Sequence, residues 1–336
     1  MGLAVYMARG PEWAKLPVAG MLAEYQLLWH EWEEVGSCLK VATARGPLRL
    51  KRFAYPASEF PFVYALVQYL AQQGFPHPER IVPTSQGHSG IITTDGFFYL
   101  AHWQEGKAGF GLDEVPLTKI GELLGCLHGK SWGFQPAQPT HPARSQWGEW
   151  PSKLTRRYHD LVRFAELARQ GDSPFDCLFA QQAAGFIYTA ERVLGRLEQQ
   201  ACYYDIVNSD RKARYACHRD FIPRNLVCTS RGELALIDFD NAAYAERIDD
   251  IAKMLQWFAG WQLADAQDLV HGYERWFPLQ DEEVLLVKIF LEFPMEYWQL
   301  GRHAYEGGRA RLGALRAWVK ASRGKDRFLD NLERVK

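Results

Sequence analysis

Apolar and polar residues alternate with a period of two in short runs of the first third of the chain, and such runs predict half-buried β-strands. Four runs of this kind are found: 39–43, 48–53, 81–84 and 96–102. The first two flank Ala44-Arg45-Gly46-Pro47, a turn sequence, so they are predicted to form a β-hairpin. After this hairpin, apolar residues recur every three or four positions over 59–73, which predicts a helix that ends before Gly74.

The helical period dominates the second half of the chain. It predicts helices at 117–130, 151–170 and 176–200 and along most of the tail, 264–336. The segment 132–150, rich in Pro, Trp and Gly, is predicted to be a loop packed on these helices, and residues 1–17 a loose leader. The spacing over 18–32 is helical, although its last residues fit a first strand equally well. Together these patterns predict an α+β, two-lobed fold, with a β-rich lobe over 1–102 and a larger helical lobe over 103–336.

Three short β-rich runs interrupt the helical half: 214–217, 225–229 and 233–237. The last two are joined by Ser230-Arg231-Gly232, a turn sequence, and therefore predict a second hairpin. His218-Arg219-Asp220 precedes this hairpin, Asn225 opens it, and Asp238-Phe239-Asp240 follows it. Because the two strands of a hairpin begin and end on the same side, Asn225 and Asp238 are expected to lie close together.

The resulting pattern, H-x-D-x-x-x-x-N followed by D-F-D, is typical of phosphoryl transfer from ATP. Such transfer needs a carboxylate that orients and deprotonates the acceptor hydroxyl, and hard oxygen ligands that hold Mg²⁺ against the phosphates. We therefore predict Asp220 as the catalytic residue, with Asn225 and Asp238 as metal ligands. The alternative is a surface hairpin whose acids are ordinary turn residues. Asp250 is expected to cap the next helix or to brace the catalytic loop, and His128 to be a packed helix-end histidine.

The strand at 48–53 carries the candidate nucleotide lysine. Strand alternation puts Lys51 on the face opposite Leu48 and Leu50, and a strand lysine upstream of the catalytic loop holds the α- and β-phosphates in kinases. A solvated strand lysine is the alternative, with Lys40 and Arg49 as equally basic neighbours.

Two further segments are predicted to contact the nucleotide. Gly36 and Ser37 are expected in a loop over the phosphates, although the chain has no G-x-G-x-x-G motif there. Trp103 begins the segment 103–106, which is predicted to be the hinge between the lobes, where backbone groups hold adenine.

The amino-acid composition limits the kinds of molecule that the chain is expected to bind. The 336 residues suffice for two lobes and a sizeable core. The 39 basic and 40 acidic side chains nearly cancel, which argues against nucleic acid or an anionic membrane as a partner. Six scattered cysteines without a C-x-x-C pair favour reduced thiols in the cytoplasm and argue against a zinc module. The first ten residues lack a signal-peptide pattern, and no apolar run approaches membrane-spanning length.

Beyond these patterns, the chain resembles the aminoglycoside phosphotransferase and choline kinase branch of the kinase-like fold. Within that branch it is most similar to the CotS-type spore-coat-associated proteins of endospore-forming Gram-positive bacteria. The resemblance extends from about residue 20 onward, and besides the catalytic segment it is carried by 50–52, 69–75, 99–100, 103–106, 124–128 and 147–151. It implies ATP and Mg²⁺ as cofactors and a hydroxyl acceptor, which is a small molecule or a coat component. It also implies other spore coat proteins as partners of a cytoplasmic protein.

Three residues depart from the family pattern. Arg219 stands where small-molecule kinases often have glycine, and Arg49 where a small residue is expected beside adenine. Gln68 stands where a helix glutamate would pair with the lysine, and Glu59 lies too early for that role. These departures keep a second hypothesis open, a non-catalytic kinase-like structural or assembly protein of the spore coat.

Two other classes of function fit the sequence less well. A protein kinase is disfavoured because no activation loop ending in A-P-E follows Asp238. An aminoglycoside site would favour clustered acids, whereas the region 132–200 is basic and aromatic.

Overall fold

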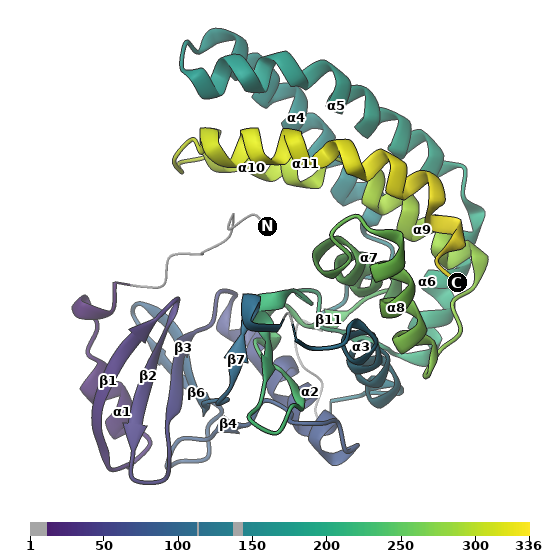
Figure 1. Cartoon of the computed structure of the whole chain (residues 1–336). Helices are drawn as coiled ribbons and strands as arrows, with labels where there is room; N and C mark the ends of the chain where they lie inside the picture. The colour runs from purple at the N-terminus through teal and green to yellow at the C-terminus, as the bar shows by residue number, and fades with distance from the viewer. Residues whose placement is uncertain (1–11, 113, 137–143) are drawn as a thin grey trace.

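The computed structural model describes residues 12–112, 114–136 and 144–336. An antiparallel sheet comes first in the chain and a larger set of helices follows, so the predicted α+β class is confirmed (Figure 1). Two predicted segments fall partly outside the described residues: 1–11 of the leader and 137–143 of the loop at 132–150. None of the helices in these three ranges has the length and apolar character needed to cross a membrane.

The main sheet contains six strands: β1 (Trp29–Val35), β2 (Cys38–Thr43), β3 (Leu48–Arg52), β4 (Ile81–Val82), β5 (Ile91–Thr93) and β6 (Gly96–His102). Their order is β1-β2-β3-β6-β4, β5 also pairs with β6, and every pair is antiparallel. The first predicted hairpin is confirmed as β2 and β3, with Cys38 opposite Lys51. The helical spacing over 18–32 divides into α1 (Val18–Ala23) and β1, so the strand interpretation holds for its last residues.

The two faces of β3 bury different kinds of side chain. Leu48 and Leu50 pack into a cluster with residues of α1 and the segment before it. Trp13 belongs to this cluster, and its ring centroid lies 5.9 Å from that of Phe98. The prediction of a loose leader is therefore wrong for its described end, since Trp13 anchors that segment on the sheet. The opposite face of β3 presents Arg49 and Lys51.

Helix α2 (Phe60–Gln72) lies close to its predicted bounds and packs on the sheet through Phe60, whose ring centroid lies 4.7 Å from that of Tyr99. The helical part follows with α3 (Leu117–Ser131), α4 (Trp150–Gln170), α5 (Pro174–Glu198), α6 (Ala201–Ala213), α7 (Arg247–Phe258), α8 (Leu263–Glu274), α9 (Asp281–Glu292), α10 (Met295–Tyr305) and α11 (Leu312–Asn331). Helices α4, α5, α10 and α11 form an arc at the top of Figure 1, and α3, α7 and α8 lie below its right-hand end, to the right of the sheet. The predicted helix at 176–200 matches α5, and α6 was not predicted.

The predicted second hairpin is confirmed as β9 (Leu226–Cys228) and β10 (Leu234–Leu236). The strand begins one residue later than predicted, because Pro223–Asn225 forms a 3₁₀ turn. Strand β7 (Lys107–Ala108) adds to β9 directly after the predicted hinge, so the chain is fixed to the catalytic hairpin as it leaves the sheet. Two short strands, β8 (Ala216–Cys217) and β11 (Ala243–Tyr244), pair with each other; β8 precedes the catalytic segment in the chain and β11 follows it.

Candidate active site

A cleft of about 950 Å³ lies between the main sheet and the catalytic segment. All seven residues predicted from the sequence line it: Gly36, Ser37, Lys51, Trp103, Asp220, Asn225 and Asp238. They come from β3, the β1–β2 turn, the segment after β6 and the two ends of the catalytic hairpin. The fold thus gathers residues that are up to about two hundred positions apart in sequence at one place; their individual roles remain predictions.

Lys51 points across this cleft. Its Nζ forms a hydrogen bond with Oδ1 of Asp238 and lies 2.8 Å from Oδ2 of Asp240. Lys51 therefore lies in the cleft and not on a solvated face of the sheet, and it points toward Asp238. Lys40, the alternative on β2, lies instead with its Nζ 5.0 Å from the ring centroid of Trp103 and does not line the cleft.

The pKa values of the two acids beside Lys51 are shifted in opposite directions. Burial alone would raise the pKa of Asp238, but the nearby ammonium of Lys51 and guanidinium of Arg49 outweigh it and hold that pKa below its usual range. For Asp240, burial outweighs the attraction of Lys51, and the adjacent charge of Asp238 adds to it, so its pKa is raised. Tyr99 donates a hydrogen bond of 2.8 Å to Asp240. Asp238 is therefore the carboxylate that stays ionised and suits a cation.

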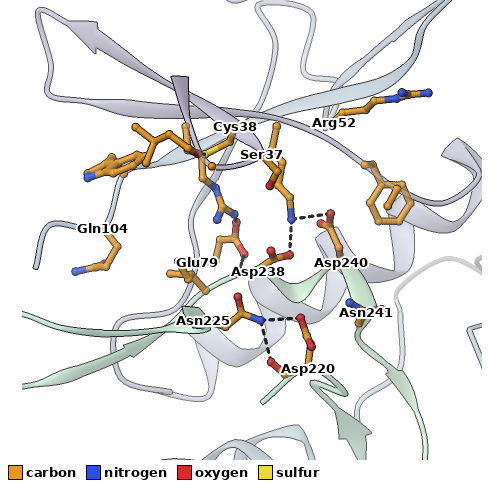
Figure 2. A pocket seen from close by; sticks show the side chains of 18 of the residues that line it. Ser37, Cys38, Arg52, Glu79, Gln104, Asp220, Asn225, Asp238, Asp240 and Asn241 are labelled. Carbon is orange, nitrogen blue, oxygen red and sulfur yellow. Dashed lines mark hydrogen bonds and ion pairs between the residues drawn. The ribbon is translucent and has the colours of Figure 1, made fainter. Parts of the chain in front are cut away.

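Glu79 supports this corner of the site and was not predicted. Its carboxylate pairs with Arg49, and its Oε2 accepts hydrogen bonds from the backbone N–H groups of Asp238, at 3.1 Å, and Phe239, at 3.4 Å. Asp238 has left-handed backbone angles, φ 70° and ψ 62°, which are costly for a residue with a Cβ. Glu79 lies between α2 and β4 after two prolines, where no periodic pattern marks a buried residue. Figure 2 shows Glu79 and Asp238 side by side in the cleft.

The helix glutamate common in kinases has no counterpart here, as predicted. Gln68 is exposed on α2, and Glu59 pairs with Arg144 at 3.0 Å. Within the described part of the chain, the acidic partners of Lys51 are Asp238 and Asp240. Arg49, expected beside adenine, does line the cleft, but its charge is matched by Glu79.

Asp220 and Asn225 are held together on the catalytic loop. The Nδ2 of Asn225 donates to the backbone carbonyl of Asp220 at 2.8 Å and to its Oδ2 at 2.9 Å, while Arg224 donates to the same Oδ2 at 3.0 Å. This arrangement turns the amide oxygen of Asn225 toward the side of Asp238 (Figure 2). An amide oxygen and a carboxylate are the hard donors that Mg²⁺ prefers, so the donor set fits this ion.

Asp250 holds the catalytic loop through the loop's backbone, which is one of the two roles predicted for it. Its Oδ2 accepts a hydrogen bond of 2.7 Å from the backbone N–H of His218, and its Oδ1 one of 2.6 Å from that of Arg219. His128, fully buried, contacts Asp250 at 3.4 Å and Tyr273 at 3.0 Å, which confirms its packed role.

Two residues of the loop itself explain its shape. The Nε2 of His218 donates to the carbonyl of Ile237 at 3.1 Å, which ties the loop to the residue before Asp238. Arg219 has φ 65°, a left-handed conformation that glycine adopts without strain. This backbone geometry suits the glycine that the resemblance led us to expect here, and the N–H of Arg219 donates a hydrogen bond to Asp250.

The sequence and the structure were compared with known proteins. A profile described as the phosphotransferase enzyme family matches residues 39–285. A search of curated proteins gave no match. Among solved structures, an aminoglycoside phosphotransferase from Alicyclobacillus acidocaldarius is similar over 97% of this chain and 97% of its own, with a TM-score of 0.78 and 22% sequence identity.

Two other solved structures share the fold. A spectinomycin phosphotransferase in complex with ADP and spectinomycin covers 90% of this chain and 92% of its own, with a TM-score of 0.67 at 11% identity. An amicoumacin kinase in complex with AMP-PNP, Ca²⁺ and Ami covers 95% and 94%, with a TM-score of 0.61 at 16% identity. These likenesses confirm the predicted kinase-like fold of the aminoglycoside phosphotransferase type. The profile match extends over more than half of the sequence, and the chain therefore belongs to the phosphotransferase enzyme family.

Proposed function

We propose that this chain transfers the γ-phosphoryl group of Mg-ATP to a hydroxyl group of a small molecule. The observation that carries the proposal is the single cleft that holds Lys51, Asp238, Asn225 and Asp220 on its walls. Two of the related structures were solved with ADP or AMP-PNP, which supports a nucleotide in this cleft.

Each residue has a defined task in this proposal. Backbone groups near Trp103 hold adenine, the turn at Gly36 and Ser37 covers the phosphates, and Lys51 neutralises the α- and β-phosphates. Asp238 and Asn225 hold Mg²⁺, which draws charge from the phosphate oxygens when it is bound. Because Lys51 is held between two acids, its side chain is already positioned in the cleft before ATP enters.

Asp220 handles the acceptor. Its carboxylate orients the acceptor hydroxyl and takes its proton as the hydroxyl oxygen bonds to the γ-phosphorus. The bond between the γ-phosphorus and the bridging oxygen breaks at the same time, and ADP leaves with that oxygen. The hydrogen bonds from Asn225 and Arg224 fix the direction of this carboxylate.

The proposal also includes the finer features that the sequence indicated. The boundary between the lobes is placed between residues 102 and 103, and the protein acts in the cytoplasm, in association with the spore coat. The acceptor is then a small molecule or a coat component. Support for the coat comes from the resemblance to CotS-type proteins.

A second candidate function is a non-catalytic, kinase-like assembly protein of the spore coat. It is favoured by one feature, the β1–β2 turn. Val35 pairs with Cys38 in this hairpin, so Gly36 and Ser37 form a tight two-residue turn that offers few backbone N–H groups to phosphates. The intact set of Asp220, Asn225 and Asp238 favours the enzyme.

A thermal-shift titration with ATP, with and without Mg²⁺, tests the proposal. A ligand at 100 times its Kd stabilises the folded state by about 2.7 kcal/mol, so wild type is expected to melt at a higher temperature with Mg-ATP. The Asp238→Ala variant is expected to lose the Mg²⁺-dependent part of this shift. The control Asp268→Ala, on the exposed side of α8, is expected to retain it. If the melting temperature of the wild-type protein does not rise with Mg-ATP, the proposal is wrong.

A further inference from the structure

A second hollow, of about 190 Å³, opens beside the nucleotide cleft. Asp220 and Arg224 line both spaces, so the predicted catalytic carboxylate lies where the two meet. An acceptor whose hydroxyl reaches Asp220 from the side opposite to ATP must occupy this hollow. Its walls come from α4, the catalytic loop, α7, α9 and the first half of α10.

Positive charge dominates these walls. Five cationic side chains line the hollow, against two carboxylates. The cations are Lys153, Arg157, Arg219, Arg224 and Lys253, and the carboxylates are Asp220 and Asp249. Lys153, Arg157, Arg219 and Lys253 line this hollow without lining the nucleotide cleft, so the phosphates of ATP do not account for them.

Two of these cations share a single carboxylate. Asp249 serves two cations, since its Oδ2 lies 2.7 Å from the Nζ of Lys253 and 3.3 Å from the Nε of Arg219. The Nε of Arg219 is buried and, at that geometry, has no hydrogen-bond acceptor among the described residues. A buried donor without an acceptor is unfavourable, and an anion in the hollow would supply one.

Lys153, on another wall of the hollow, also indicates that an anion would bind there. Its Nζ contacts Gln146 and lies 2.8 Å from Glu149, a rim residue whose side chain is 40% exposed. Burial lowers the pKa of Lys153, and the positive charge of Arg219 lowers it further. Burial and the neighbouring Arg219 both disfavour the charge of Lys153, and an anion in the hollow would offset them.

The aromatic face near the hollow is already used by a cation. The guanidinium of Arg157 lies 4.7 Å from the ring centroid of Trp298, and that of Arg302 lies 4.8 Å from the same ring. An aromatic ring is how a site attracts an ammonium ligand by cation–π contact. Trp298 does not itself line the hollow, and a cationic acceptor there would face five positive side chains.

We infer that the acceptor is a small hydroxyl compound that carries an anionic group, a carboxylate or a phosphate, held by Lys153, Arg157 and Arg219. The inference rests on the proposed function, because it names the substrate class for the same site. The volume sets the size: pockets for drug-sized ligands are roughly 300–1,000 Å³, so this hollow admits a compound of a few carbon atoms. The positive charge of the walls disfavours polycationic amino sugars and choline-like amines. The small volume of the hollow disfavours large acceptors.

A matched three-carbon series tests the charge directly. Glycerate and glycerol 1-phosphate are the anionic members, glycerol is neutral, and 3-amino-1,2-propanediol is cationic. ATP consumption is measured with each at equal concentration. A charge-assisted hydrogen bond corresponds to roughly a 10- to 100-fold preference, so kcat/KM for an anionic member is expected to exceed that for glycerol by this factor. The two anionic members distinguish a carboxylate from a phosphate.

Variants locate the preference in the hollow. Lys153→Gln and Arg157→Gln are expected to lower the anionic-to-neutral ratio about tenfold, with the Kd for Mg-nucleotide unchanged. Each has a matched control. Arg163, also on α4, lies 4.7 Å from the ring centroid of Phe164, and Lys288 pairs with Glu333 at 3.0 Å; neither residue lines the hollow. Arg163→Gln and Lys288→Gln are expected to keep the wild-type ratio.

A binding measurement separates this inference from the proposed function. Trp150 and Trp257 line the hollow, so acceptor binding is expected to change tryptophan fluorescence without any nucleotide. Anionic members should bind more tightly than glycerol, and Lys153→Gln should weaken them. Absence of Mg-ATP binding would overturn the proposed function and leave this result interpretable. If the cationic or neutral member binds or reacts as well as the anionic ones, or if no anion binds more tightly than glycerol, the inference is wrong.

Discussion

Glu79 holds Asp238 by its backbone and leaves the carboxylate of Asp238 free. The Oε2 of Glu79 accepts a hydrogen bond of 3.1 Å from the Asp238 N–H, while its other oxygen pairs with Arg49. The side chain of Asp238 consequently faces Lys51 and the proposed metal. The pair formed by Glu79 and Arg49 thus stabilises a left-handed backbone that would otherwise relax.

Glu79→Ala is therefore expected to weaken Mg-nucleotide binding at least about tenfold, because Asp238 loses its anchor. It should also destabilise the fold by about 3–5 kcal/mol, since Arg49 is left buried without its partner. The double variant Arg49→Met with Glu79→Leu is expected to recover much of the stability but not the affinity. Urea unfolding and calorimetric titration measure the two effects. Wild-type affinity in Glu79→Ala would contradict the anchoring role.

Lys51→Met is expected to destabilise the protein by about 3 kcal/mol at pH 7 and by clearly less at about pH 2. In the wild type the pKa of Asp238 is lowered on folding. Its contribution to stability is therefore present above the unfolded value, about 3.9, and is lost as the pH falls through the folded value. Removal of Lys51 abolishes that contribution, so the two proteins converge in acid.

Urea unfolding of wild type and Lys51→Met at both pH values measures this convergence. Lys288→Met, which removes a surface partner of Glu333, is the control and should change stability by less than about 1 kcal/mol at either pH. A deficit of equal size at pH 7 and at about pH 2 in Lys51→Met would show that Lys51 does not stabilise the ionised acids.

At position 219 the usual order of alanine and glycine should be reversed. Arg219 has φ 65°, a conformation that costs a residue with a Cβ about 1–2 kcal/mol. Arg219→Gly is thus expected to be more stable than Arg219→Ala by about 1 kcal/mol. At Arg211, inside α6, the alanine variant should be the more stable by about 1 kcal/mol. Denaturant midpoints of the four variants decide the question, and the same order at both positions would contradict the backbone assignment.

Helices α3 and α8 approach so closely that glycine is required on both. A Cβ on Gly121 would lie 1.9 Å from the carbonyl oxygen of Leu269, and one on Gly272 would lie 1.9 Å from that of Thr118. Gly121→Ala is expected to destabilise the protein by about 3 kcal/mol, because backbone must move. Gly185→Ala, in α5 with open space around it, should be neutral or stabilising. Equal melting temperatures for the two variants would contradict the close packing.

The sequence predicted the local elements of the site well, because these depend on short-range patterns. Alternation placed Lys51 on the cleft face of β3, and the turn at Ser230-Arg231-Gly232 set the hairpin that unites Asn225 and Asp238. The left-handed Arg219 was marked by the glycine expected there, although only the structure gives its angle.

Other parts of the site depend on tertiary contacts that leave no periodic signal. Glu79 lies in an irregular loop, and its partner Arg49 looked like a solvated or adenine-facing residue until the fold joined the two. Asp240 was noted within D-F-D, but its contact with Lys51 required the packed structure. The acceptor hollow combines α4, α7 and α10, so its charge could be seen in the sequence only as a basic, aromatic region.

The most direct test of the central claim is the rate of Mg-ATP turnover in wild type and in Asp220→Asn, with both proteins first shown to bind Mg-ATP. Asp220 lies where the nucleotide cleft meets the acceptor hollow, and a general base contributes roughly 10²- to 10⁴-fold to the rate. The account predicts measurable turnover in wild type, a loss of at least about a hundredfold in Asp220→Asn, and nearly unchanged nucleotide affinity. Equal, negligible rates in two proteins that both bind Mg-ATP would contradict it and favour the non-catalytic coat protein.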